Sequence, residues 1–285
     1  MNKFLRTIKE IMRPIVPTFI RSLLRYGSNK KVNSNSYESR WEGDFNTWQE
    51  VEAITTGYDA DSILQKVKES LLKVKNKQAA YERDSVLFDE IQYSWPLLAT
   101  IQKIAVENEN ELALLDFGGS LGSSYFQNRE FLGNEIKVDW NIVEQPHFVQ
   151  EGQNTFESGE LHFFLTAEQC LAEKKISTLL LSGVLQCLEA PLDWVAKFCD
   201  YGFEYIIVDR CSIHSLEKDR LTAQWVAPAI YEASYPCWFF GKERLVASFQ
   251  EKYEMLFEFD PHAGYKIHFE NSYGYFKGFV FRRRA

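Results

Sequence analysis

Three glycines and one acid stand close together in Asp116-Phe117-Gly118-Gly119-Ser120-Leu121-Gly122, which directly follows an apolar run. Glycine lets the main chain turn sharply and lets a ligand approach it closely. The first amides of a following helix have no partner inside that helix, and Asp116 can orient loop amides or accept a hydrogen bond from a ligand ammonium group. The pattern predicts a ligand-binding loop; the alternative is a tight strand-to-helix turn.

A second acid, Glu144, ends the next apolar run, 22 residues after Gly122. At the end of a strand in a nucleoside-binding α/β fold, an acid accepts hydrogen bonds from the hydroxyl groups of a ribose. Gln145 stands beside Glu144 and belongs to the same candidate site. The alternative for Glu144 is a solvated loop carboxylate. Together with the glycine loop, this acid predicts a nucleoside-type cofactor.

The glycine spacing narrows the class of cofactor. The dinucleotide fingerprint G-x-G-x-x-G fails here because Ser120 stands where a glycine is needed. The phosphate-binding pattern G-x-x-x-x-G-K-[ST] does not occur in the sequence. A dehydrogenase and a P-loop nucleotide hydrolase are therefore disfavoured.

Short apolar strands alternate with helices from residue 109 onward, which indicates a parallel sheet covered on both faces. The chain ends differently, because two predicted strands, Tyr253–Phe259 and Tyr275–Arg282, have no helix between them and should form an antiparallel pair that closes the sheet. The other predicted strands are Leu112–Phe117, Val138–Val143, Leu161–Leu165, Ser177–Leu181 and Tyr205–Asp209, and the predicted helices are Ser123–Leu132, Ala167–Glu173, Pro191–Cys199 and Lys242–Gln250.

The region before the sheet is predicted to be helical. Ile63, Val67 and Leu71 give Asp61–Lys75 a helical spacing, and Leu87–Val106 is predicted as a helix that Pro96 kinks or restarts. Thr47 stands three residues before Glu50, which suits a capping box.

The start of the chain is basic and amphipathic. Residues 1–31 carry eight basic side chains and one acidic one, and Phe4, Ile8, Ile11 and Met12 share one helical face. Such a segment suits a peripheral membrane contact; the alternative is a helix packed on its own domain or on a partner. We therefore divide the chain into a basic amphipathic segment (1–26), a linker (27–40), a helical N-terminal region (41–108) and an α/β domain (109–285).

Composition excludes several other classes. The net charge of −8 over 285 residues argues against nucleic-acid binding. The five cysteines contain no C-x-x-C pair, so we expect neither a metal site nor disulfides, and we place the protein in the cytoplasm. No apolar run is long enough for a spanning helix, and no secretory signal opens the chain.

These motifs resemble a known superfamily. Asp116, Gly118 and Gly122 match the acid-x-Gly-x-Gly-x-Gly motif of class I S-adenosylmethionine-dependent methyltransferases, with Ser120 at the middle glycine. A methyltransferase family associated with surface-polysaccharide gene clusters is similar over roughly residues 35–283. The matching stretches are Trp41-Glu42-Gly43, Gly57-Tyr58-Asp59, Tyr81-Glu82-Arg83-Asp84, Asp116–Phe126, Glu144-Gln145-Pro146, Val208-Asp209-Arg210 and Ser234–Phe240.

The resemblance implies a Rossmann-like fold with a mostly parallel seven-stranded sheet, and S-adenosylmethionine as cofactor. In that superfamily the region after the fourth strand lines the cofactor, which places Ser182, Gly183 and Gln186 there; the alternative is an ordinary strand end and helix start. Tyr81 is expected to close over the cofactor, or else to belong to a charged cluster at a helix start.

Methyl transfer to an alcohol depends mainly on positioning, helped by a base that accepts the proton. We rank His214 and His262 ahead of His147 as base candidates, although a lone histidine is more often structural. Asp209 and Arg210 can bind or polarise the acceptor, and Arg210 can hold a phosphate or carboxylate bidentately; the alternative is a structural ion pair. The aromatic residues 225–240 suit stacking on a sugar, core packing or an oligomer interface.

The expected function is methylation of a small or lipid-linked saccharide in cell-surface polysaccharide synthesis. O-methylation is the default and N-methylation of an amino sugar the variant. The protein is expected to be cytoplasmic, with segment 1–26 holding it at the inner membrane face, and an oligomer is compatible with the sequence. The alternative is a catalytically inactive, methyltransferase-like binding or scaffold protein. A third reading is another enzyme with a nucleoside ligand, such as one acting on a nucleotide-sugar.

Overall fold

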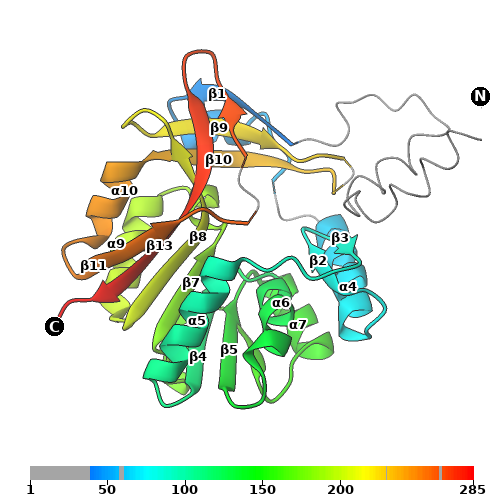
Figure 1. Cartoon of the computed structure of the whole chain (residues 1–285). Helices are drawn as coiled ribbons and strands as arrows, with labels where there is room; N and C mark the ends of the chain where they lie inside the picture. The colour runs from blue at the N-terminus through cyan, green and yellow to red at the C-terminus, as the bar shows by residue number, and fades with distance from the viewer. Residues whose placement is uncertain (1–38, 58–60, 229, 263–264) are drawn as a thin grey trace, which may run out of the picture. The chain divides into compact units, whose positions relative to one another are not determined.

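Seven strands form the central part of an eleven-stranded sheet in the described residues (Figure 1). Five neighbouring strands run parallel in the order β6-β5-β4-β7-β8, β13 pairs antiparallel with β8, and β11 pairs antiparallel with β13. This confirms the predicted α/β fold with an antiparallel pair at its end. The strands are β4 (Glu111–Phe117), β5 (Lys137–Val143), β6 (Leu161–Phe164), β7 (Thr178–Ser182), β8 (Tyr205–His214), β11 (Tyr253–Phe259) and β13 (Tyr273–Arg283).

The computed structural model describes residues 39–57, 61–228, 230–262 and 265–285, with the side chains of residues 61 and 62 left out. Residues 39–285 form one compact unit. The amphipathic segment 1–26, all but the end of the linker 27–40, and Tyr58 and Asp59 of the Gly57-Tyr58-Asp59 motif lie outside the described residues. No helix of the described part is both long and apolar enough to cross a membrane.

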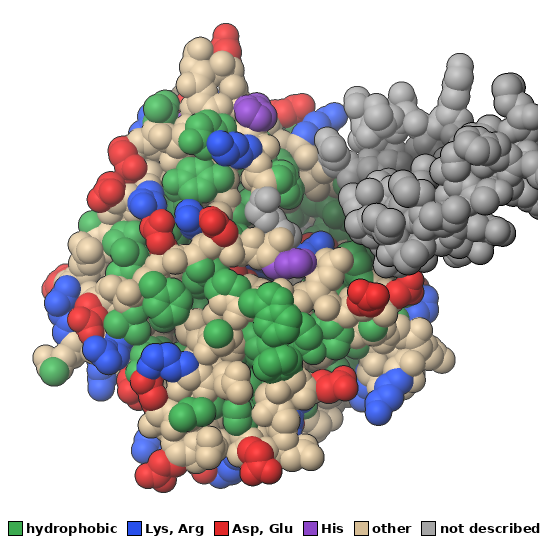
Figure 2. Space-filling model, in the orientation of Figure 1, with side chains coloured by type: hydrophobic (Ala, Val, Ile, Leu, Met, Phe, Trp, Pro, Cys, Tyr) green, Lys and Arg blue, Asp and Glu red, His purple; other side chains and the backbone are tan. Residues whose placement is uncertain are grey.

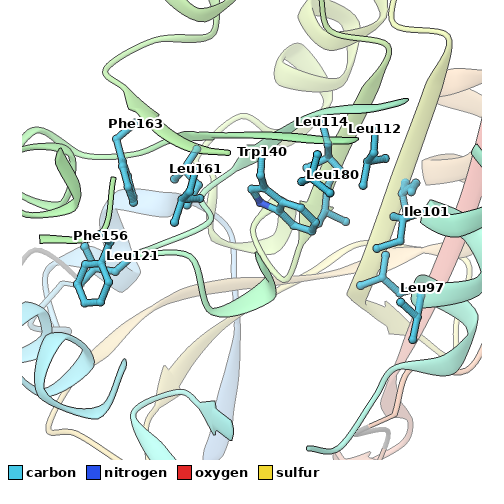
Figure 3. Close-up of a cluster of buried hydrophobic side chains, with 14 of the residues drawn as sticks. Leu97, Ile101, Leu112, Leu114, Leu121, Trp140, Phe156, Leu161, Phe163 and Leu180 are labelled. Atoms are coloured by element: carbon cyan, nitrogen blue, oxygen red, sulfur yellow. The ribbon is translucent and has the colours of Figure 1, made fainter. Parts of the chain in front are cut away.

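Helices cover both faces of the sheet because its central strands are apolar on both sides. Leu114 and Leu180 contribute to one buried cluster, which Trp140 and Ile101 also join (Figure 3), whereas the neighbouring Leu115 contributes to the other. The first face is packed by α4 (Asp61–Lys75), α5 (Trp95–Glu107), α6 (Ser123–Leu132) and α7 (Pro146–Thr155), and the second by α8 (Ala167–Glu173), α9 (Pro191–Tyr201) and α10 (Lys242–Phe249).

The prediction of a helix over Leu87–Val106 is wrong in its first part. The helix α5 begins only at Trp95, with Pro96 in its first turn. Before it lies a hairpin of β2 (Tyr81–Arg83) and β3 (Val86–Phe88), joined by Asp84 and Ser85 with φ of 50° and 62°. Positive φ at both central residues is the feature of the tight turns that match strand twist.

The structure also contains a sheet extension that we did not predict. The strands β1 (Arg40–Phe45), β9 (Arg220–Trp225) and β10 (Ser234–Gly241) lie side by side and antiparallel, and β10 joins the end of β8 (Figure 1). The 41–108 region therefore contributes strands as well as helices. The short helix α3 (Trp48–Glu52) begins as predicted, because Thr47 Oγ1 accepts a hydrogen bond from the amide of Glu50.

An aromatic cluster is exposed where α5 begins and α6 ends. Tyr93, Trp95 and Phe131 have ring centroids 5.1–5.5 Å apart, and Trp95 is 58 % exposed. Figure 2 shows a hydrophobic area on this side of the molecule, with charges of both signs around it. This cluster lies outside the cavity described next.

Candidate functional site

A cavity of about 870 Å³ opens at the carboxyl ends of the parallel strands, where open α/β sheets bind their ligands. The loops after β4, β5, β6 and β7 form one side together with Asp209 and Arg210 of β8, and the β2–β3 hairpin and β10 also contribute. The predicted site residues that line it are Tyr81, Asp116, Gly118, Gly119, Ser120, Glu144, Gln145, Ser182, Gly183, Asp209, Arg210 and His262.

The loop Gly118-Gly119-Ser120, which we call the glycine cradle, lines the cavity. Gly118 has φ of +74°, and a Cβ atom added there would lie 2.6 Å from Cγ2 of Val184. At Gly119 an added Cβ would lie 2.7 Å from Cγ of Asp116. Both positions therefore require glycine. Ser120 adopts φ of 55°, the region that a glycine would occupy, so its departure from the glycine pattern leaves the path of the loop intact.

Gly122 forms part of a tight strand-to-helix turn, the alternative to a ligand-binding role. It precedes α6 with φ of +105°, and its missing side chain faces Leu161 and Ile142 of the core. It is not among the residues that line the cavity.

Glu144 links the glycine loop to the end of β5. One carboxylate oxygen accepts a hydrogen bond from the amide of Ser120 at 3.3 Å, and the other from the amide of Gln145 at 2.7 Å. A carboxylate has about four lone-pair sites, so each oxygen keeps a site for a ligand hydroxyl. Burial raises the pKa of Glu144, which indicates that a hydrogen-bonding ligand would stabilise its ionised form.

Asp116 is buried under the loop, with 1 % of its surface exposed. Trp140 Nε1 donates to Oδ2 at 3.1 Å, whereas Oδ1 has no hydrogen-bond partner among the described residues. Burial raises the pKa of this carboxyl to about 7. An unpartnered buried carboxylate beside a cavity suits a cationic or hydrogen-bond-donating ligand.

The hairpin contributes an acid that we did not select. Glu82 is 1 % exposed; it accepts hydrogen bonds from the hydroxyl of Ser123 and, at 3.0 Å, from the amide of Ser85. Burial raises its pKa to about 7. Through Ser123 it fixes the hairpin to the first turn of α6. Tyr81 beside it remains a neutral phenol, because burial raises its pKa to about 12.

A bulge in β8 turns two neighbouring side chains toward the cavity. The pairing with β13 passes from Lys277↔Cys211 to Phe279↔Val208, so Asp209 and Arg210 together oppose one residue. Two adjacent side chains of a regular strand would point to opposite faces. Arg210 has φ of 52°, a strained conformation that functional sites often retain.

Two side chains at and after the end of β7, those of Ser182 and Gln186, hold this bulge in place. Ser182 Oγ donates to Asp209 Oδ2 at 2.9 Å and accepts from Arg210 Nε at 3.2 Å. Gln186 donates to the carbonyl of Arg210 at 3.1 Å, so it supports the bulge from outside the lining. Burial raises the pKa of Asp209, and its Oδ1 has no hydrogen-bond partner among the described residues.

The three histidines differ in position. His214 is 1 % exposed, and its two ring nitrogens lie 2.9 Å from the Lys218 carbonyl and 2.9 Å from Ser272 Oγ. It lies outside the cavity and has a structural environment. His147 does not line the cavity either, whereas His262 does.

No protein-family model and no curated protein matches the sequence. Among solved structures, an S-adenosylmethionine-dependent methyltransferase from Clostridium acetobutylicum is similar with 10 % identity and a TM-score of 0.41, over 68 % of this chain and 93 % of that chain. The N-terminal domain of EvdMO1, crystallised in the presence of S-adenosylhomocysteine and D-fucose, is similar with 12 % identity and a TM-score of 0.43. The similarity covers 76 % of this chain and 97 % of that chain. At these values, the function proposed below depends on the site itself.

One apolar part of the cavity was missed by the sequence analysis. Leu165 and Thr166 follow β6, and Val184, Leu188 and Trp194 follow β7. The ring of Trp194 lies 5.1 Å from that of Phe117, measured between centroids. These residues make this part of the lining mostly apolar, which suits a flat heterocycle, and we call it the slot. In the sequence, only their positions after predicted strands could have indicated that they line the cavity.

Raised carboxyl pKa values predict how stability depends on pH. In the folded protein the pKa values of Asp116 and Glu82 are about 7, against 3.8 and 4.5 for the free groups. Between these values the folded state binds more protons than the unfolded state. The free energy of unfolding should therefore decrease as pH rises from about 4 to 8, by on the order of several kcal/mol. Urea unfolding at pH 5 and pH 8 measures this difference.

The Asp116→Asn variant should lose part of that pH dependence, because the amide keeps an acceptor for Trp140 and cannot ionise. Glu173→Gln is the control, since Glu173 is exposed and should leave the dependence as it is in the wild type. A wild-type stability that rises between pH 5 and pH 8 would contradict the prediction.

Proposed function

We propose that this protein is an S-adenosylmethionine-dependent methyltransferase. The observation that carries the proposal is the joining of the glycine cradle to Glu144, whose carboxylate ends β5 and accepts from the loop amide of Ser120. A nucleoside with an attached amino-acid chain needs a hydroxyl acceptor, a slot for a flat base and a small-residue loop. The cavity has all three.

Each part of the cofactor has residues that fit it. Glu144 would accept from the two ribose hydroxyls, and the slot of Leu165, Val184, Leu188 and Trp194 would hold the adenine ring. Gly118, Gly119 and the carboxylate of Asp116 would hold the amino-acid part beneath Tyr81. When bound, this cofactor supplies an electrophilic methyl group on a sulfonium centre. The unpartnered Oδ1 of Asp116 favours such a cationic ligand, because a nearby positive charge stabilises the ionised carboxylate.

Asp209 is the strongest candidate for the base within the cavity. It ends the regular part of β8, and its Oδ1 has no partner among the described residues. An acceptor hydroxyl positioned at that oxygen would release its proton to Asp209 as its own oxygen bonds to the methyl group, while the sulfur–methyl bond breaks and S-adenosylhomocysteine is left. Because burial raises the pKa of Asp209, the carboxylate is a stronger base than an exposed aspartate. His262, which also lines the cavity, is the second candidate.

A saccharide acceptor is supported by the remaining walls. The aromatic residues Trp48, Tyr231 and Tyr235 line the cavity, which suits stacking on a sugar ring. We propose O-methylation of a sugar or glycolipid in surface-polysaccharide synthesis, with N-methylation of an amino sugar as the variant. The basic segment 1–26 would keep the enzyme at the inner membrane face that carries a lipid-linked acceptor.

Calorimetry with S-adenosylmethionine and S-adenosylhomocysteine tests the cofactor, and transfer of labelled methyl groups to bacterial glycolipid and saccharide fractions tests the reaction. Micromolar binding with transfer would support the proposal. Absence of binding at millimolar ligand would refute it. Tight binding without transfer to any fraction would favour the alternative of a catalytically inactive binding protein.

A further inference from the structure

We propose that Arg210 anchors an acidic group, a carboxylate or a phosphate, on the methyl acceptor. This inference depends on the proposed function and makes it more specific, because it predicts an anionic saccharide such as a uronic acid or a sugar phosphate. Its support is the way in which the bulge of β8 exposes a guanidinium inside the cavity.

The structure holds Arg210 in an unfavourable backbone conformation. An L-residue with φ of 52° is strained, and the bulge removes regular pairing from β8 at this point. Without the bulge, Asp209 and Arg210 would point to opposite faces of the sheet. With it, both line the cavity. The backbone of the bulge is tied by Gln186 at the Arg210 carbonyl and by the Gly183 amide at the Asp209 carbonyl.

The guanidinium is fixed at one nitrogen and open at the other two. Nε donates to Ser182 at 3.2 Å and lies 3.8 Å from Oδ2 of Asp209. Among the interactions of the described residues, none joins Nη1 or Nη2 to an acceptor. The side chain of Arg210 is 36 % exposed, against 3 % for Asp209. A fork of two free N–H groups is the geometry that binds carboxylates and phosphates bidentately.

Gly183 keeps space beside this fork. It has φ of +72°, and an added Cβ would lie 3.5 Å from Nη2 of Arg210. A larger side chain would therefore stand against the nitrogen that we assign to the ligand.

The other basic side chains of the cavity have their own partners. Lys197 forms an ion pair with Glu168 at 2.7 Å, and the guanidinium of Arg83 lies over the ring of Phe88 at 5.3 Å. Arg210 is compensated by acids, since Asp84 and Asp209 raise its pKa although burial lowers it. Asp84, at the tip of the hairpin, makes no direct ion pair with it in the described structure. A ligand anion can therefore reach the guanidinium while Asp209 keeps its contact with Nε.

The test uses binding of three probes to the full-length protein: p-nitrophenyl β-D-glucuronide, glucose 6-phosphate and the neutral p-nitrophenyl β-D-glucoside. Calorimetry is done with and without saturating S-adenosylhomocysteine. We expect the wild type to bind at least one of the anionic probes tenfold or more tightly than the neutral one. Glucuronide binding alone indicates a carboxylate, and sugar-phosphate binding alone indicates a phosphate.

Arg210→Gly is the informative variant, because glycine accepts the positive φ of this position, and thermal unfolding checks that it folds. It should lose the preference for the anionic probe and keep S-adenosylhomocysteine affinity within about threefold. Arg210→Lys keeps the charge without the fork and should lose most of the preference. Arg244→Met is the control, since Arg244 is exposed and outside this cavity.

Three results would overturn the inference. The first is no preference for either anion in the wild type. The second is an Arg210→Gly variant that keeps the anion preference. The third is an Arg210→Gly variant that loses S-adenosylhomocysteine affinity tenfold, which would assign the guanidinium to the carboxylate of the cofactor. Anion binding measured without S-adenosylhomocysteine distinguishes failure of the Arg210 inference from failure of the proposed function. If the protein binds the anion through Arg210 but never binds S-adenosylhomocysteine, only the methyltransferase proposal is refuted.

Discussion

Replacing Gly118 by alanine is expected to weaken S-adenosylhomocysteine binding by about 100-fold or more. The new Cβ would lie 2.6 Å from Val184 Cγ2, in a residue whose φ is +74°. To relieve that contact, either the glycine loop or Val184 must move, and both line the cavity. A 100-fold loss of affinity corresponds to about 2.8 kcal/mol of binding free energy. Calorimetry on the purified variant measures it, and thermal unfolding reports the accompanying strain.

Gly133→Ala is the matched control for that experiment. Gly133 has φ of +69°, nearly the value at Gly118, and an added Cβ would meet nothing within 4 Å. With ψ of −174°, Gly133 lies in a region that L-residues rarely adopt, so alanine there should lower stability by about 1–3 kcal/mol and leave cofactor affinity unchanged. If the two variants bound S-adenosylhomocysteine equally well, the cradle would have no part in binding.

Replacing Glu144 by alanine is expected to weaken S-adenosylhomocysteine binding by roughly 100-fold or more. Two hydrogen bonds to a charged acceptor are lost, each of about 1.5–3 kcal/mol, and the amide of Ser120 loses the partner that holds the glycine loop. Calorimetry gives the loss. Glu144→Gln keeps one oxygen and should fall between the wild type and Glu144→Ala.

The exposed Glu135 supplies the control for Glu144, and Glu135→Ala should bind as the wild type does. Adenosine is a useful second ligand, because it has the ribose without the amino-acid chain. A Glu144→Ala variant that lost affinity for S-adenosylhomocysteine but not for adenosine would show that the carboxylate acts on the loop and not on the ribose.

The sequence predicted those parts of the fold that local patterns encode. Continuous apolar runs identified the buried parallel strands, since both faces of each are covered; the predicted strand Ser177–Leu181 corresponds to β7 (Thr178–Ser182). The glycine loop and Glu144 were found because each follows such a run. Both line the cavity in the structure.

Long-range pairing was not predictable in the same way. The strand β10 contains Pro236 within an aromatic run, and its place depends on β9 and on two residue pairs with β8. The β2–β3 hairpin requires positive φ at Asp84 and Ser85, which are not the Asn-Gly or Asp-Gly pairs that announce such turns. Glu82 was missed for this reason, because only the hairpin brings it to Ser123.

Histidine positions show the limit of selecting residues by type. His214 was ranked high for its proximity to Asp209 in sequence, yet β8 continues through it, and its ring is enclosed by Lys218 and Ser272. Asp209 and Arg210 owe their orientation to a bulge, a feature of the pairing between β8 and β13 that no single segment specifies.

The pairing of β1 with β9 has a consequence for association between molecules. Residues Arg40–Phe45 occupy one edge of β9 and β10 occupies the other, and Trp41 packs in a buried cluster with Cys237, Phe239 and Ile267. A chain shortened to residues 109–285 would expose a row of unpaired amides and carbonyls along β9 beside uncovered aromatic rings, which is a template for strand addition from a second molecule. Within the intact chain the edge of the described sheet is instead β1, whose charged Arg40, Glu42 and Asp44 and whose register shift between Glu42 and Phe45 disfavour strand addition.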